Sequence, residues 1–184
     1  MGRLVYFSEV PKDRETSAMF AELAMPLFDQ LYNFAHWLTQ DRSEADDLVQ
    51  ETYSKALRGF SSFQPGTNFR AWIYRILRNT FLTSRTGLKA TSVQVELDEA
   101  AESIAEAETP ESIFIDQSQQ QLLQKAIEAL PLHYREVVLL CDVEEMPYKE
   151  IAETLSIPIG TVMSRLARAR RDLRQALQVK LVRR

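Results

Sequence analysis

Apolar residues recur at three- and four-residue spacing along most of this chain, and that spacing is typical of helices with one buried face. The stripes lie at about 27–38, 45–60, 69–84, 122–130, 151–155 and 162–177. No segment shows a convincing alternation of apolar and polar residues, which is the pattern of a half-buried strand. The sequence therefore predicts an all-α fold.

Interruptions in the stripes indicate where helices end. Pro26 is expected near a helix start or at a kink. Ser43 followed by Asp46 is similar to a capping box and predicts a helix start at Ser43, with Asp in place of Glu. Pro65 and Gly66 predict a turn within a loop over 61–68. Pro131 is expected to end the helix that carries the 122–130 stripe.

The distribution of charge divides the chain further. Net charge is −4, but residues 90–124 hold eight acids and no base. We predict a flexible N-terminus over 1–17, a helical domain over 18–88, an acidic linker over 89–112 and a second helical domain over 113–184. The expected architecture is two small helical domains joined by the acidic linker.

Two basic segments flank the acidic one. Residues 64–95 hold five bases and no acid, and residues 161–184 hold eight bases and one acid. Each segment coincides with a helical pattern, which favours an anionic partner such as nucleic acid. The plainer interpretation is a set of solvated helix faces.

The sequence argues against several classes of protein. The longest apolar run, 137–141, is too short for a membrane span, and the first residues do not form a signal peptide. A single cysteine, Cys141, allows no intrachain disulfide and fits a reducing cytoplasm. Glycine-rich nucleotide loops are absent, and His36 and His133 lack neighbours that suggest a catalytic or metal site. We expect no cofactor, no metal and no enzyme activity.

The C-terminal third has the pattern of a helix-turn-helix. Residues 148–155 form a short amphipathic helix, 156–158 a turn, and a long helix begins at about Gly160. The side of the long helix opposite its apolar stripe is basic. This arrangement predicts DNA binding, with early residues at base edges and later arginines at phosphates. The alternative is an arginine-rich surface helix in a bundle.

The helix predicted over 69–84 carries a second candidate nucleic-acid surface. On a helical wheel, one arc gathers Arg70, Tyr74, Arg75, Arg78 and Arg85. Guanidinium groups and aromatic rings both stack on unpaired bases, so this arc suits single-stranded nucleic acid. We expect Phe69 to pack in the core. Trp72 lies at the edge of the apolar face, so it can both pack in the core and contact nucleic acid.

A polar cluster occupies the first turns of the helix that follows Ser43. Its members are Asp46, Asp47, Gln50 and Glu51. Acids at this end of a helix favour its dipole. An exposed acidic arc would equally suit a basic protein partner. Spacing alone does not decide between stabilisation of the helix dipole and binding of a partner.

Three ordered blocks resemble the extracytoplasmic-function (ECF) sigma factors of bacterial RNA polymerase. The blocks are Asp46-Asp-Leu-Val-Gln-Glu-Thr-Tyr53, Phe69-Arg-Ala-Trp-Ile-Tyr-Arg-Ile-Leu-Arg-Asn79, and Leu130-Pro-Leu-His-Tyr-Arg-Glu-Val-Val138 with Tyr148-Lys-Glu-Ile-Ala152 and Gly160-Thr-Val162. The likeness spans about Phe20 to Gln175. It implies that the first domain is similar to sigma region 2 and the second to sigma region 4.

The resemblance implies three sets of site residues. Those that would bind polymerase are Asp46, Asp47, Leu48, Gln50 and Glu51. Those that would contact the promoter −10 element are Phe63, Asn68, Arg70, Trp72, Tyr74, Arg75, Arg78, Asn79 and Arg85. Those that would contact the −35 element are Tyr148, Lys149, Thr161, Met163, Ser164, Arg165, Arg168 and Arg171. Many relatives carry a basic residue where this chain has Met163, so the resemblance implies no −35 preference there.

The implied partners are core RNA polymerase, through the clamp helices of its largest subunit and its flap region, promoter DNA in duplex and single-stranded form, and an anti-sigma factor. The implied function is promoter recognition, strand opening and transcription initiation in the cytoplasm, including in a stress response. Two alternatives come from other classes of protein. A stand-alone helix-turn-helix regulator would bind operator DNA as a dimer, and a helical adaptor would use only its acidic surface. The basic and aromatic middle helix argues against the regulator, and the C-terminal excess of seven positive charges argues against the adaptor. The linker acids are expected to shield both basic surfaces in the free protein.

Overall fold

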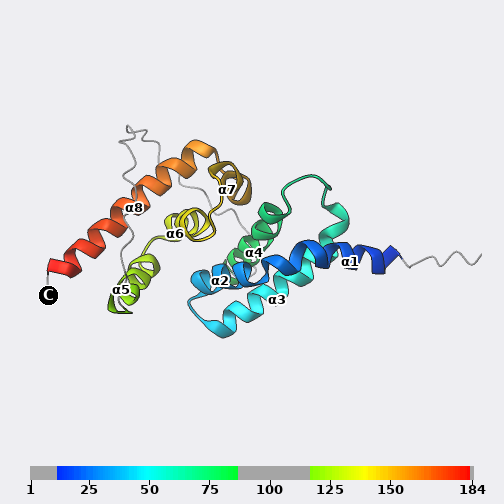
Figure 1. Ribbon diagram of the computed structural model, residues 1–184, viewed down its shortest axis with the longest axis horizontal. Helices are drawn as coiled ribbons and strands as arrows, with labels where there is room; N and C mark the ends of the chain where they lie inside the picture. Colours follow the sequence, from blue (N-terminus) through cyan, green and yellow to red (C-terminus); the bar gives the residue numbers. More distant parts are fainter. Residues whose placement is uncertain (1–11, 87–116, 183–184) are drawn as a thin grey trace, which may run out of the picture.

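A computed structural model describes residues 12–86 and 117–182, and within these ranges all regular secondary structure is helical. The predicted all-α fold is confirmed. The predicted acidic linker, residues 89–112, lies wholly outside the described residues, as do residues 1–11. Figure 1 shows a group of N-terminal helices and a group of C-terminal helices that meet along α4.

The N-terminal group is built from four α-helices and two short 3-10 turns. They are α1 (Lys12–Ala24), η1 (Met25–Leu27), α2 (Phe28–Thr39), α3 (Arg42–Gly59), η2 (Phe60–Ser62) and α4 (Phe69–Thr86). The first helix begins at Lys12 and so includes residues 12–17 of the N-terminal segment that was predicted to be flexible. Pro26 lies at the start of the 3-10 turn between α1 and α2 and so occupies the predicted break.

The N-cap of helix α3 lies two residues before Ser43, the predicted start. Asp41 is the N-cap, and its carboxylate accepts a hydrogen bond from the Glu44 N–H at 2.9 Å. The prediction that Ser43 starts this helix was therefore wrong. Both residues have side chains suited to capping, and the extended backbone at Asp41 decides between them because a cap must lie just outside the helix.

The apolar stripes meet in the centre of the N-terminal group. Leu31 and Phe34 of α2, Val49 of α3, and Ile73 and Leu77 of α4 are all buried. Burying each such side chain contributes about 1.5–3 kcal/mol relative to leaving it in water. Phe69 is also buried, as predicted. This core fixes which faces of α3 and α4 are left for partners.

The C-terminal group contains α5 (Gln117–Glu128), α6 (Leu132–Val138), a five-residue π-helix η3 (Leu139–Val143), α7 (Tyr148–Leu155) and α8 (Ile159–Val182). Pro131 precedes α6, where its fixed φ suits a helix start. Val162, Leu166 and Ala169 of α8 are buried against α6 and α7. The predicted helix-turn-helix is thus formed by α7 and α8.

A tight turn sets the angle between α7 and α8. Ser156 adopts a left-handed conformation with φ of 56°, and its N–H donates to the Ala152 carbonyl. The Ile157 N–H donates to the same carbonyl at 3.1 Å. The carbonyl of Pro158 then accepts from Thr161 and Val162 at the start of α8. These bonds satisfy the backbone groups at both helix ends.

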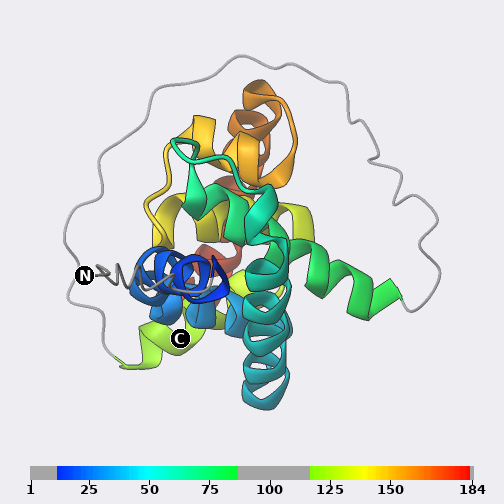
Figure 2. The ribbon, with the colours of Figure 1, turned by 90° about the vertical axis from the view of Figure 1, so that its right-hand side faces the viewer.

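Helix α4 belongs to both groups. It packs on α2 and α3 through its apolar face and on α7 through its basic side. In the view of Figure 2 the green ribbon of α4 crosses in front of the yellow ribbon of α6. The candidate nucleic-acid helix of the N-terminal group is therefore partly covered by the C-terminal group.

Candidate nucleic-acid interface

Helix α4 presents the arc predicted to contact single-stranded nucleic acid, and the structure divides this arc in two. Arg75, Asn79 and Arg85 are exposed. Arg70 and Arg78 are half-buried, and Tyr74 is fully buried. The prediction that Tyr74 shares an exposed arc with the arginines is wrong for this arrangement, because the C-terminal helices cover that part of α4.

Arg78 is held by a carboxylate of α6. Its Nε donates to Glu136 Oε1 at 2.7 Å, and its Nη2 donates to Oε2 at 3.2 Å. Only 1% of Glu136 is exposed. Burial raises the pKa of Glu136, while the positive charges of Arg78 and Arg165 oppose that rise. Arg165 is a predicted −35 residue, so one buried carboxylate faces residues from both candidate DNA surfaces.

Tyr74 and Arg70 contact the segment between η3 and α7. The Tyr74 hydroxyl donates to Glu144 Oε2 at 2.7 Å, and Arg70 Nη2 lies 3.5 Å from the same oxygen. Arg70 also donates to the Glu144 carbonyl and lies 3.9 Å from Glu150. Burial and the Glu144 carboxylate raise the pKa of Tyr74. Burial raises the pKa of Glu144, against the hydrogen bond from Tyr74 and the charge of Arg70.

The loop before α4 is anchored by aromatic rings. Phe63 stacks on Phe60 at 5.9 Å and lies 5.3 Å from the rings of Phe69 and Trp72. Gly66 adopts φ of 87°, a conformation that favours glycine and fits the predicted turn. Half-buried Phe63 and Trp72 therefore have packing roles in the loop as well as accessible ring edges.

Asn68 has a structural role that its predicted contact with DNA did not include. Its Oδ1 accepts a hydrogen bond from the Ala71 N–H at 3.0 Å. This is the geometry of an N-cap for α4, which begins at Phe69. Asn68 thus fixes the start of the helix that carries the arginines.

The predicted acidic arc lies on the surface of α3. Asp46, Asp47, Gln50 and Glu51 are exposed, whereas Leu48 is buried in the core. Glu51 lies 3.3 Å from Lys55, one turn further along the helix. Leu48, one of the predicted polymerase-binding residues, therefore packs mainly in the core beneath the arc.

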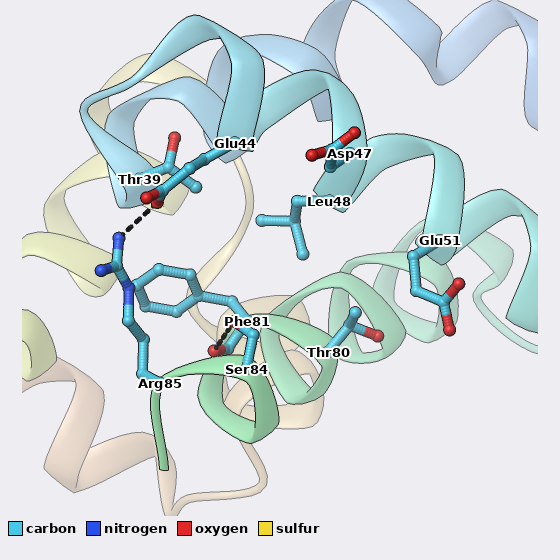
Figure 3. A pocket seen from close by; sticks show the side chains of 9 residues that line it. All are labelled: Thr39, Glu44, Asp47, Leu48, Glu51, Thr80, Phe81, Ser84 and Arg85. Atoms are coloured by element: carbon cyan, nitrogen blue, oxygen red, sulfur yellow. Dashed lines mark hydrogen bonds and ion pairs between the residues drawn. The ribbon is translucent and has the colours of Figure 1, made fainter. Parts of the chain in front are cut away.

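A shallow hollow of about 360 Å³ runs between this arc and the end of α4. Figure 3 shows the side chains that line it, with Leu48 and Phe81 toward its floor and acids along α3. Arg85 closes one end through a 2.6 Å ion pair with Glu44. An apolar floor beneath an acidic rim suits a basic amphipathic helix.

The second helix of the helix-turn-helix is exposed along most of its predicted contact side. Met163, Ser164 and Arg171 are exposed, and Thr161, Arg165 and Arg168 are half-buried. Tyr148 and Lys149 lie exposed at the start of α7. Burial lowers the pKa of Arg165, although Glu136 favours its charged form. Most of this side of α8 is therefore available to a DNA groove.

Three acids that sequence reasoning did not single out complete the site: Glu136, Glu144 and Glu150. The signal for Glu136 was present, because this acid lies in a helical run directly before the apolar residues Val137 to Cys141. A charged residue so placed requires a buried partner. Helical periodicity does not reveal that this partner lies on α4.

Within 12–86 and 117–182, no group of three His, Cys, Asp or Glu side chains is arranged to hold a metal ion. In the same ranges, no helix combines the length and apolarity that a membrane crossing requires.

Two family descriptions match the chain. Residues 23–90 match Sigma-70 region 2, and residues 120–173 match Sigma-70, region 4. The first match covers α2 to α4 and the second covers most of α5 to α8. The two candidate DNA surfaces thus fall in separate matched regions.

Curated relatives and solved structures agree with these matches. The chain is 35% identical over 168 residues to the ECF RNA polymerase sigma factor SigE of Mycolicibacterium smegmatis, covering 90% of this chain and 64% of that relative. It is 32% identical over 142 residues to the ECF RNA polymerase sigma-E factor of Escherichia coli, covering 73% and 74%. A structure of the sigma factor RpoE in complex with the anti-sigma factor NepR from Bartonella quintana is 31% identical, with a TM-score of 0.66 and coverage of 88% and 98%. CnrH in complex with the cytosolic domain of CnrY shares the fold, with a TM-score of 0.60 at 24% identity.

Proposed function

Because the chain belongs to the ECF sigma factors of bacterial RNA polymerase, we propose that it binds core polymerase and directs promoter recognition, strand opening and transcription initiation. The proposal rests on one observation. Two basic helices, α4 and α8, lie in separate segments that match sigma regions 2 and 4 in that order. The chain spans 64% of the length of the mycobacterial relative, so the activity proposed is that of these two regions.

Polymerase binding is assigned to the acidic arc of α3. Asp46, Asp47, Gln50 and Glu51 are exposed, and two of them, Asp47 and Glu51, line the hollow that also contains Leu48 and Phe81. A basic helix placed there would gain charge complementarity at the rim and apolar contact at the floor. The proposed partner at this surface is the pair of clamp helices in the largest polymerase subunit. The flap region would hold the C-terminal domain.

Recognition of the −10 element is assigned to the 61–68 loop and α4. Arg75, Asn79 and Arg85 are exposed, and Phe63 and Trp72 are half-buried near the start of α4. Stacking on an aromatic ring contributes about 1–3 kcal/mol per unpaired base, which helps to hold the opened strand. Arg70, Tyr74 and Arg78 join this surface only when the C-terminal helices move away.

Recognition of the −35 element is assigned to α8. Ser164 near its start has the small polar side chain of a base contact, while Arg168 and Arg171 lie further along toward the phosphates. Exposed Met163 offers apolar contact, for example to a thymine methyl group. Tyr148 and Lys149 at the start of α7 would contact the backbone beside the groove.

The solved relative from Bartonella quintana is bound to an anti-sigma factor. We propose that a protein of this kind also binds the present chain and keeps it from polymerase. The protein would act in the cytoplasm, where polymerase is found, and would carry out no covalent chemistry of its own.

Run-off transcription with core polymerase tests the proposal. A pool of genomic fragments would be transcribed with and without the protein, and start sites would be mapped. We expect new start sites that share one −35 and one −10 sequence. Protein-bound fragments without new transcripts would instead indicate the stand-alone operator-binding regulator.

A further inference from the structure

Three acids of the C-terminal group, Glu136, Glu144 and Glu150, face the basic side of α4. We propose that they form a clasp that holds the free protein closed. The inference rests on the proposed function of α4 at the −10 element. In the closed state these carboxylates bind the side chains of α4 that would otherwise contact the opened DNA strand. The protein must therefore release the clasp before α4 can contact DNA along its full arc.

The strongest contact of the clasp joins Arg78 to Glu136. Two donors of the guanidinium meet two oxygens of the carboxylate, at 2.7 and 3.2 Å, and the carboxylate is almost wholly buried. Paired donors of this kind are stronger and more directional than a single ion pair. The contact also spans the two helix groups, because Arg78 lies on α4 and Glu136 on α6.

The second contact lies further toward the start of α4. Tyr74 donates to the Glu144 carboxylate at 2.7 Å, and Arg70 reaches both that carboxylate and the Glu144 carbonyl. The Glu144 carboxylate is 4% exposed. Glu150 on α7 supports the same guanidinium at 3.9 Å. The two contacts are one helical turn apart, so together they fix both position and rotation of α4.

DNA and the clasp compete for the same cations. Phosphate groups and carboxylates are both acceptors for Arg78 and Arg70. A carboxylate that already neutralises a half-buried guanidinium weakens the attraction of that guanidinium for a phosphate, and the C-terminal group covers the donors that face it. A carboxylate left without its cation in a buried setting is strongly unfavourable, so Glu136 and Glu144 must reach water as DNA binds. Binding therefore requires separation of the helix groups rather than rearrangement of side chains alone.

The clasp differs from shielding by the acidic linker, the mechanism expected from sequence. Linker residues 89–112 lie outside the described residues, whereas Glu136 lies on α6, Glu150 on α7, and Glu144 in the segment between η3 and α7. The two mechanisms predict different effects of substitution. Neutralising linker acids would matter only for shielding, and neutralising Glu136 and Glu144 would matter only for the clasp.

The test combines the substitutions Glu136→Gln and Glu144→Gln in the full chain. Glutamine keeps the size of the side chain and removes its charge, which weakens its hold on the arginines. Glu153→Gln, which alters an exposed acid of α7, is the matched control. Small-angle scattering would report the radius of gyration, and anisotropy of a short fluorescein-labelled oligothymidylate would report access to α4.

We expect the double variant to have a larger radius of gyration and to bind the oligothymidylate about tenfold more tightly than wild type, because α4 regains two cations for phosphates. The control should match wild type in both. If circular dichroism shows that the double variant is unfolded, Glu144→Gln alone replaces it, since both polar partners of that carboxylate lie on α4. An unchanged radius with affinity within twofold of wild type would overturn the clasp. So would a gain in affinity that appears only when linker acids are neutralised.

Failure of the clasp and failure of the proposed function give different results. If the wild-type protein supports run-off transcription but the variants neither open nor gain affinity, only the clasp is wrong. If the variants open and gain affinity but wild type never supports transcription with core polymerase, the clasp holds and the sigma-factor function is wrong.

Discussion

Arg170 of α8 donates to both carboxylate oxygens of Asp142 in η3, at 2.5 and 3.3 Å, and so ties the recognition helix to the π-helix behind it. Its guanidinium also lies 3.6 Å from the sulfur of Cys141. Exposed ion pairs contribute about 0–1 kcal/mol. The angle of α8 therefore depends mainly on its buried stripe, including Val162 and Leu166, and the ion pair adjusts the local electrostatics of the thiol.

Cys141 is expected to be a slow nucleophile. Burial, together with the negative charge of Asp142, raises the pKa of the thiol to about 11. Since only the thiolate reacts, alkylation by iodoacetamide at pH 8 should be at least about tenfold slower than for an exposed peptide thiol and should accelerate as the pH rises toward 11. Asp142→Asn should lower the pKa and speed the reaction, whereas Glu153→Gln should not. Mass spectrometry of alkylated protein over a pH series measures the rates, and a plateau below pH 9 would contradict the shift.

Helical periodicity was sufficient to predict most of the fold. The stripe over 162–177 predicted α8, and the stripe over 69–84 predicted α4 within two residues of its end. Such stripes are informative because every third or fourth residue must face a core. The helix-turn-helix followed from the short break at 156–158 between two amphipathic segments.

The candidate site was predicted less completely, for two physical reasons. Periodicity shows that Tyr74 and Arg78 share a face of α4 but not that another helix group covers that face, and so Tyr74 was placed in solvent. Long-range partners such as Glu136 leave no repeat in the sequence, since 58 residues separate this acid from Arg78. Local chemistry was equally ambiguous at Asp41 and Ser43, where either side chain would cap α3.

Asn68 should stabilise the protein as the N-cap of α4. Asn68→Ala removes the acceptor for the Ala71 N–H and should cost about 1 kcal/mol, whereas Asn68→Asp keeps the acceptor and should cost little. Urea denaturation followed by circular dichroism measures both. Asn79→Ala, at an exposed site on the same helix, is the control. Equal stability of the Ala and Asp variants would show that the cap contributes nothing measurable.

Reversing charge on the acidic arc should abolish polymerase binding without unfolding the protein. Asp47→Lys combined with Glu51→Lys places two cations where the proposed partner is basic, and both sites are exposed and outside the core. A pull-down with purified core polymerase measures retention. Glu22→Lys, on the exposed side of α1, is the matched control and should bind normally. Retained affinity in a folded double variant would remove α3 from the polymerase interface.

Substitutions on α8 should separate base recognition from phosphate binding. Ser164 lies exposed near the start of the helix, so its replacement should alter the preferred −35 bases, a change worth about 1–3 kcal/mol for each lost base contact. Arg168→Ala should weaken binding to all sequences about equally and reduce its salt dependence, as expected for a phosphate contact. Arg165→Ala should do both, because this half-buried residue lies between Ser164 and Arg168 on the contact side of α8. Selection from a library randomised over the −35 region, with polymerase holoenzyme at two salt concentrations, measures preference and salt slope together.

Arg174→Ala, further along the exposed side of α8, is the control and should leave base preference unchanged. If all three contact variants keep the wild-type preference and affinity, the DNA lies against another face of the C-terminal helices.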